Sequence, residues 1–123
     1  MSLLFHPDLV GVEVVGDVTL IRLTTARFED GNAEAIGQQL NDLVERLDRH
    51  KMHLDLGQVE FMSSLGLAKL IALHKKVRAV GGEFRVYNAR PAVYQVFAAT
   101  HLTKLLDVRP QEPEQDTLRG ASA

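Results

Sequence analysis

The hydrophobic positions in the first part of the chain follow two different periods. Runs of β-branched and aliphatic residues at Val12–Val15 and Val18–Leu23 are separated by Gly16-Asp17, and a glycine in a two-residue loop allows the positive φ of a tight hairpin turn. From Ile36 to Leu47, apolar residues instead recur at the spacing of an amphipathic helix. The pattern predicts a β-hairpin and then a helix from about Asn32 to Arg49, with Asn32 as its N-cap.

The rest of the chain alternates short apolar runs with longer periodic stretches. Met52–Leu56 and Glu83–Tyr87 are predicted strands, because both are short and rich in apolar residues. A second helix is expected from about Ser64 to Val80, ended by Gly81-Gly82. Pro91 suits the first position of a third helix that ends at about Ala99.

The order of these elements predicts the fold class. Thr100 is expected to cap a last short helix, which gives the order ββαβαβαα. Strands joined through a helix are parallel by default, because such crossovers are right-handed. We therefore expect an α/β fold, in which a mixed β-sheet of four to five strands carries about four helices packed mainly on one face. Residues 1–108 form the predicted domain, and residues 109–123, which lack periodicity, are a predicted flexible C-terminal tail.

Composition narrows the classes of function. Lys and Arg number 14 against 16 Asp and Glu, and the chain has no Cys. A near-neutral charge gives no general attraction to nucleic acid or to an anionic membrane, and a chain without Cys forms no disulfide or thiolate metal site. No apolar run approaches the ~20 residues of a membrane-spanning helix, and no signal peptide is expected. We expect a cytoplasmic protein that neither binds nucleic acid nor inserts into a membrane.

Little in the sequence predicts catalysis. The serine-containing turn is not a G-x-S-x-G motif, and no base or oxyanion donor is placed beside it. The histidines lack metal-site spacing, and no dinucleotide or P-loop motif is present. His74 is expected to be a hydrogen-bonded core or boundary histidine. Lys69, Lys75 and Lys76 are expected to point outward into solvent or toward an acidic protein surface. We expect no enzyme activity, no cofactor and no metal.

The segment Leu54–Leu70 is the most informative part of the chain. It contains a predicted strand, a loop, Ser63 and Ser64, and then a helix with Gly66 in its first turn. Either serine could simply cap the helix. Gly costs ~1 kcal/mol in a helix relative to Ala, so Gly66 indicates close approach of another backbone or of a partner. A serine at a helix N-terminus is also a favourable phosphorylation site.

These motifs resemble those of the STAS domain, the fold of bacterial anti-sigma factor antagonists and of the cytoplasmic tails of sulfate transporters. The resemblance covers roughly Val12–Val108. The residues that carry it are Leu54-Asp55-Leu56, Phe61-Met62-Ser63-Ser64-Leu65-Gly66-Leu67, Gly81-Gly82-Glu83, Asn88-Ala89-Arg90-Pro91 and the Leu102–Leu106 run.

The resemblance implies a regulatory protein that is switched by phosphorylation. In the antagonists, a partner that is both anti-sigma factor and serine kinase, with a histidine-kinase-like ATPase fold, phosphorylates the serine that corresponds to Ser64. A PP2C-type phosphatase removes the phosphate, and only the unmodified form binds the partner. The implied partner-binding residues are those around this serine and in the loop before the first helix, namely Glu29, Asn32, Ser63, Ser64, Leu65, Gly66 and Leu67.

One departure from the family pattern leaves an alternative open. The family aspartate that precedes the phosphorylated serine is Ser63 here, and the second hydroxyl residue is Leu65. Ser63 could therefore be the acceptor in place of Ser64. The change also favours a second hypothesis, a STAS scaffold or subunit of a transporter ATPase or sensory complex that is never phosphorylated.

Overall fold

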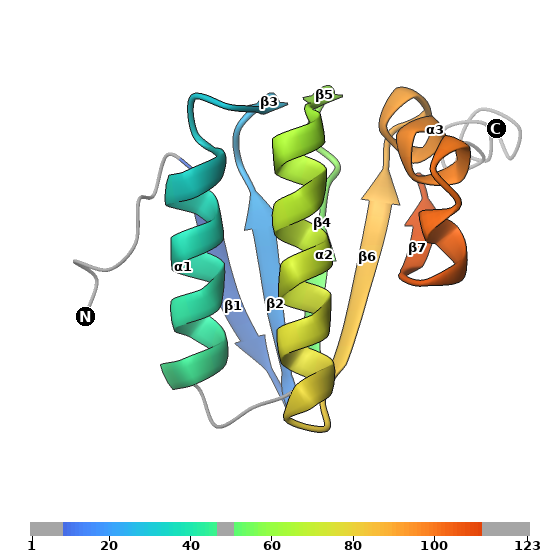
Figure 1. Ribbon diagram of the computed structural model, residues 1–123. Coiled ribbons are helices and arrows are strands. Elements are labelled where there is room, and N and C mark those ends of the chain that lie inside the picture. Colours follow the sequence, from blue (N-terminus) through green and yellow to red (C-terminus); the bar gives the residue numbers. More distant parts are fainter. Residues whose placement is uncertain (1–8, 47–50, 112–123) are drawn as a thin grey trace, which may run out of the picture.

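The computed structural model describes residues 9–46 and 51–111, and within them the chain forms two sheets and a layer of helices (Figure 1). The elements are, in order, β1 Val10–Val15, β2 Val18–Leu23, β3 Arg27–Phe28, α1 Ala33–Arg46, β4 Lys51–Asp55, β5 Phe61–Met62, α2 Ser64–Ala79, β6 Glu83–Ala89, α3 Pro91–Ala99, the 3₁₀ helix η2 Leu102–Lys104, and β7 Asp107–Pro110.

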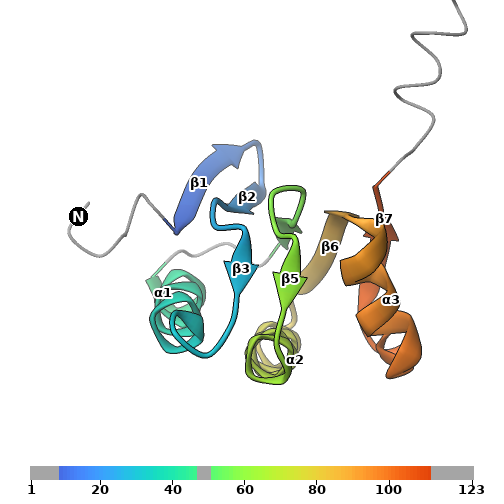
Figure 2. The ribbon, with the colours of Figure 1, turned by 90° about the horizontal axis from the view of Figure 1, so that it is seen from above.

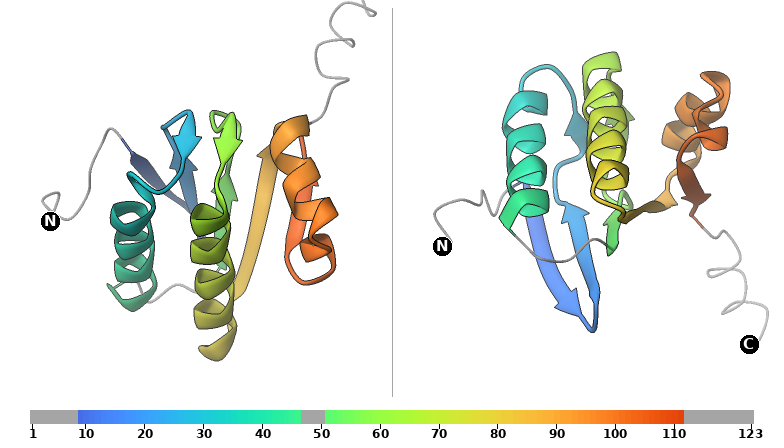
Figure 3. Two further views of the ribbon diagram at one scale, coloured as in Figure 1. Left: turned by 45° about the horizontal axis from the view of Figure 1, so that its top comes forward. Right: turned by 60° about the horizontal axis from the view of Figure 1, so that its bottom comes forward.

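The main sheet is mixed, as predicted. Its strand order is β1-β2-β4-β6-β7, with β1 and β2 antiparallel and every other neighbouring pair parallel. Gly16, with φ 64°, makes the β1–β2 turn. Figure 2 shows α1, α2 and α3 on one face of this sheet, and both views of Figure 3 agree. The described residues thus confirm the predicted fold class, with three α-helices and one 3₁₀ helix in place of about four helices.

The hydrophobic core lies between the sheet and the helices. Ile21, Leu54 and Val86 occupy matching register positions on β2, β4 and β6, and all are fully buried. The next position along each strand faces the uncovered side of the sheet and carries polar groups such as Arg22 and Asp55. This alternation explains why the strands were visible in the sequence.

The C-terminal part of the domain differs from the prediction. Thr100 does not begin a helix but ends α3, and its hydroxyl donates to the carbonyl of Val96 at 2.8 Å. The chain then forms β7 parallel to β6, a strand that the sequence analysis missed. Because Val108 alone is buried in β7, no alternating pattern marks this edge strand.

The end of β7 bears on the predicted domain boundary. The strand runs two residues past Val108, to Pro110, and the N–H of Gln111 donates to the carbonyl of Ala89 at 2.7 Å. Most of the predicted tail, residues 112–123, lies outside the described residues, as do residues 47–50 at the predicted end of the first helix. A flexible tail therefore stays a prediction.

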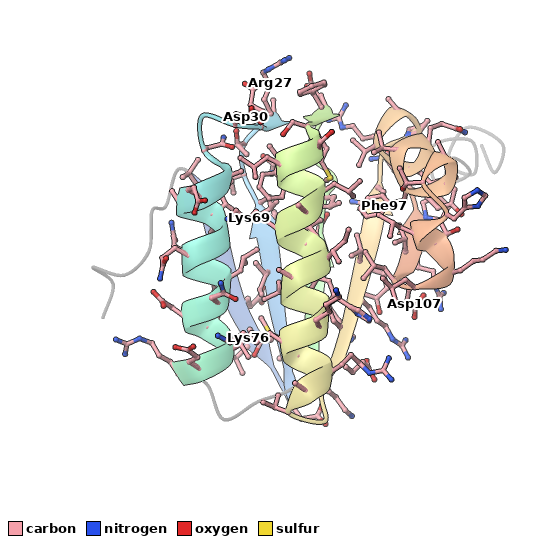
Figure 4. The ribbon with its side chains drawn as sticks, in the orientation of Figure 1. Arg27, Asp30, Lys69, Lys76, Phe97 and Asp107 are labelled. Atoms are coloured by element: carbon pink, nitrogen blue, oxygen red, sulfur yellow. The ribbon has the colours of Figure 1, made fainter. Side chains whose placement is uncertain are left out.

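Two of the three lysines expected to point into solvent instead connect α1 with α2. Lys69 Nζ lies 2.9 Å from Glu34 Oε2, and Lys76 pairs with Glu45 in the same way. Figure 4 shows both lysines reaching toward α1. Of these three lysines, Lys75 is exposed and Lys69 and Lys76 are half-buried, so this helix face does not present a free row of cations to an acidic partner.

Candidate functional site

The two serines before and at the start of α2 have different environments. Ser63 is the N-cap: its backbone is extended, and its Oγ accepts a hydrogen bond from the N–H of Gly66 at 3.1 Å. Its own N–H donates to the carbonyl of Phe28 at 2.9 Å. Ser64 is the first helical residue and is exposed. The capping role, which the sequence left open between the two, belongs to Ser63, and the hydroxyl of Ser64 is presented to solvent.

A second small sheet holds the start of α2 against the segment that follows β2. β3 and β5 pair in parallel, with Arg27 opposite Phe61 and Phe28 opposite Met62 (Figure 2). The side chain of Phe28 is completely buried. A β-carbon on Gly66 would lie 2.7 Å from the carbonyl oxygen of Phe28. The close approach that Gly66 indicated is therefore made by the backbone of this chain.

The predicted partner-binding residues of α2 differ in accessibility. Ser64 is exposed and Leu65 is half-buried, whereas Gly66 and Leu67 are buried in the first turn of the helix. A macromolecule that docks on this end of α2 would touch Ser64 and the accessible part of Leu65. Gly66 and Leu67 would act by fixing the position of that surface.

Asn32 organises the loop before α1. Its Oδ1 accepts from the N–H of Glu29 at 3.0 Å, and its Nδ2 donates to the carbonyl of Arg27 at 2.8 Å. The expected N-cap bond from Asn32 to the first turn of α1 is therefore replaced by bonds back into the loop. This arrangement fixes Glu29 beside β3, at the same end of the molecule as Ser64.

Sequence reasoning missed Arg27 and Phe61, which lie at this end of the molecule. The guanidinium of Arg27 sits 4.4 Å from the centre of the Phe61 ring, and its Nε is 3.0 Å from Glu29 Oε2. The hydrogen bond and the charge of Glu29 raise the pKa of Arg27. Phe61 is 41% exposed. The exposure of Phe61 follows from the β3–β5 pairing, and no local sequence pattern indicated it.

Asp55 holds the loop that leads into β5. Its Oδ1 accepts from the N–H of Gly57 at 2.7 Å and from Asn88 Nδ2 at 3.2 Å, and its Oδ2 lies 3.5 Å from Arg22. Arg90 donates to the carbonyl of Gly57 at 2.8 Å. Although 24% of the Asp55 side chain is exposed, its carboxylate oxygens are engaged within the protein, so Asp55 helps to fix the geometry of the site.

Three features are absent from the part of the chain that the structure describes: a metal-binding cluster, a membrane-spanning helix and a side-chain partner for the Ser64 hydroxyl. Within residues 9–46 and 51–111, no group of three or more His, Asp or Glu could hold a metal ion. No helix in these two segments could cross a bilayer. Among the described residues, no side chain hydrogen-bonds to the Ser64 hydroxyl.

Comparison with known proteins identifies the family. The model of the STAS domain matches residues 10–115. The chain belongs to the STAS domain family. Two curated relatives of this STAS domain are the anti-sigma F factor antagonist of Paenibacillus polymyxa, 23% identical over 95 residues (77% of this chain and 80% of the relative), and BtrV of Bordetella bronchiseptica, a candidate anti-sigma factor antagonist, 29% identical over 92 residues (75% and 78%).

Solved STAS structures share the architecture. An anti-sigma factor antagonist from Mycobacterium paratuberculosis superposes with a TM-score of 0.75 at 26% identity, covering 96% of this chain and 98% of that one. The antagonist SpoIIAA superposes in its unphosphorylated form (TM-score 0.64, 16% identity, 93% and 98% covered) and, from Bacillus, in its phosphorylated form (TM-score 0.65, 18% identity, 91% and 97% covered).

Proposed function

We propose that this STAS protein is a non-enzymatic anti-sigma factor antagonist, which binds an anti-sigma factor kinase and is switched off by phosphorylation of Ser64. The observation that carries the proposal is that the two serines have different roles at the start of α2. Ser63 supplies the helix cap, so the exposed Ser64 hydroxyl is not needed for folding. The relatives named as antagonists, and the existence of a phosphorylated form of SpoIIAA, support the same conclusion.

The proposed modification needs only a hydroxyl from this chain. Oγ of Ser64 attacks the γ-phosphorus of ATP bound to the partner, the bond to the ADP oxygen breaks, and the hydroxyl proton passes to a base on the partner. The phosphate then lies at the N-terminus of α2, where free N–H groups and the helix dipole favour negative charge. A PP2C-type phosphatase reverses the step by hydrolysis.

Phosphorylation would act on binding through charge. The phosphate carries a charge of about −1.5 to −2. When the partner docks on this end of α2, this charge must lose its hydration shell and is repelled by any negative charge on the partner. Misplaced charge at an interface costs several kcal/mol, and each ~1.4 kcal/mol is tenfold in affinity. A loss of at least about a hundredfold is therefore expected, which is enough for a switch.

The test is a binding measurement with a purified histidine-kinase-like ATPase from the native host of this protein. Wild type, Ser64→Ala, Ser64→Glu and the control Ser63→Ala are titrated by calorimetry with the partner held in its ADP state. Ser64→Ala should bind like wild type and resist phosphorylation, whereas Ser64→Glu should lose at least about a hundredfold. Equal affinity of all variants would contradict the switch.

The unphosphorylated scaffold is the competing function, because Ser63 replaces the family aspartate. Mass spectrometry of the protein from its native host separates the two. A phosphoserine at position 64 supports the switch. A phosphoserine at position 63 would instead make the capping residue the phosphorylated one. If neither serine is phosphorylated under any growth condition, the scaffold is favoured.

A further inference from the structure

We infer that Arg27 is the receptor of the Ser64 phosphate: on phosphorylation, its guanidinium leaves Glu29 and Phe61 and pairs with the phosphate. The inference rests on the proposed function, whose modification it explains in structural terms. It assigns a role to a cation that lies outside the motif residues.

The pairing of β3 with β5 brings Arg27 to the same end of the molecule as Ser64. The N–H of Ser63 donates to the carbonyl of Phe28 at 2.9 Å. In the parallel register Arg27 lies opposite Phe61, three residues before Ser64, so its side chain would have to extend along β5 toward the start of α2 to reach the phosphate. The β3–β5 pairing and the close contact of Gly66 with Phe28 hold the two segments together. The long, exposed side chain of Arg27 stands at this end of the molecule (Figure 4).

The present partner of Arg27 can be exchanged. The Arg27–Glu29 ion pair has 58% and 36% of its two side chains exposed, and exposed ion pairs contribute little to stability. A phosphate carries more charge than a carboxylate and offers three acceptor oxygens, which suit the planar fork of a guanidinium. The phosphate would therefore compete successfully with Glu29 for the same cation.

The residue that precedes Ser64 favours the transfer of Arg27 from Glu29 to the phosphate. Position 63 holds a neutral serine whose hydroxyl is occupied by the N–H of Gly66. No carboxylate directly precedes the phosphorylated residue, so none competes there for Arg27 or repels the phosphate. The unusual residue at this position and the nearby arginine are thus parts of one electrostatic arrangement.

The exchange would alter the surface beyond the phosphate itself. Arg27 now covers one face of the partly exposed Phe61 ring and neutralises Glu29. Its departure would uncover the ring and leave Glu29 with a free negative charge. The loop backbone would stay in place, because Asn32 holds it through the N–H of Glu29 and the carbonyl of Arg27. Phosphorylation would thus change the charge pattern of the docking surface without refolding it.

The test uses full-length protein with phosphoserine incorporated at position 64, and it needs no partner. The second pKa of the phosphate is measured by ³¹P NMR in the wild-type background, in Arg27→Gln, in Arg27→Lys and in the control Arg109→Gln on β7. Arg27 should lower this pKa by about 0.5 relative to Arg27→Gln. Arg27→Lys should give an intermediate value, and Arg109→Gln should match wild type.

A second readout follows Arg27 itself. The ¹⁵N resonance of its Nε–H should shift between the unmodified protein and the phosphoprotein. An unchanged resonance together with equal phosphate pKa values in wild type and Arg27→Gln would overturn the inference, even if Ser64→Glu loses its partner as proposed. A lowered phosphate pKa supports the inference, and if phosphorylation then leaves partner affinity unchanged, the proposed function alone fails.

Discussion

The carbonyl oxygen of Phe28 lies 2.7 Å from the point that a β-carbon on Gly66 would occupy, and the Phe28 ring carbon Cγ lies 3.1 Å from it. Both atoms belong to a residue fixed by β3 and by the core, so neither can move away easily. Glycine at position 66 thus allows β3 to pack on the first turn of α2, which in turn positions Ser63 and Ser64.

Gly66→Ala should therefore destabilise the protein although alanine favours helices. Overpacking costs about 1–3 kcal/mol, and the helix-propensity gain of about 1 kcal/mol offsets only part of it. Urea denaturation should show a net loss of up to about 2 kcal/mol. Gly37→Ala in α1 is the matched control, because its β-carbon would meet only the flexible side chain of Lys69. A Gly66→Ala protein as stable as the Gly37→Ala protein would contradict this explanation.

Periodicity was enough to predict the main elements of the fold. A run of β-branched and aliphatic residues marked β2, and hydrophobic alternation marked β4. Apolar stripes marked α1 and α2, because each helix buries one face in the same core. β7 and the two-residue strands β3 and β5 were not predicted. They are held by pairing with distant strands, and they carry too few buried side chains to leave a pattern.

The site was predictable in position but not in detail. The motif residues around Ser64 located the end of α2, and Gly66 correctly indicated a close contact. Which serine caps the helix depends on the backbone of Ser63, which is held by Phe28, far away in the sequence. The pairing of Arg27 with Phe61 depends likewise on the β3–β5 register, which no local pattern contains.

The assignment of Ser63 as N-cap predicts an asymmetry between the two serines. Ser63→Ala should cost about 1 kcal/mol, because the N–H of Gly66 loses its acceptor. Ser64→Ala should change stability by less than about 0.5 kcal/mol. Ser63→Asp should keep the cap and remain as stable as wild type, since aspartate is a good N-cap and favours the helix dipole. Thermal denaturation would rank the stabilities of these variants. A larger loss of stability in Ser64→Ala than in Ser63→Ala would refute the assignment of Ser63 as N-cap.

Asp55 should act through its hydrogen bonds more than through its charge. Asp55→Asn keeps an oxygen that can accept from Gly57 and loses only the exposed pairing with Arg22, so a cost below about 1 kcal/mol is expected. Asp55→Ala leaves the Gly57 N–H without its acceptor and should cost about 1–3 kcal/mol. Hydrogen exchange at the Gly57 amide should accelerate in Asp55→Ala and not in Asp55→Asn. Equal acceleration in both variants would show that the charge matters more.

His74 should make the protein less stable in mild acid. The residue is buried on α2 against Phe84, and its Nδ1 has no hydrogen-bond partner, contrary to the expected hydrogen-bonded histidine. Burial, and secondarily the charge of Arg78, lower the pKa of His74 below its ordinary value of 6.5. Glu83, Arg85 and Asp107 line the same cavity of about 260 Å³ as His74 and Arg78.

The sign of the pH effect follows from this lowered pKa. Below about pH 6.5, His74 becomes protonated in the unfolded chain but stays neutral in the folded protein. The free energy of unfolding therefore falls with pH until the pKa of His74 in the folded protein is reached. For one proton the slope cannot exceed about 1.4 kcal/mol per pH unit. Urea denaturation between pH 7.5 and 5 should show this loss in wild type and in the exposed-site control His101→Asn, and a smaller loss in His74→Leu. Parallel curves for wild type and His74→Leu would mean that His74 titrates normally in the folded protein.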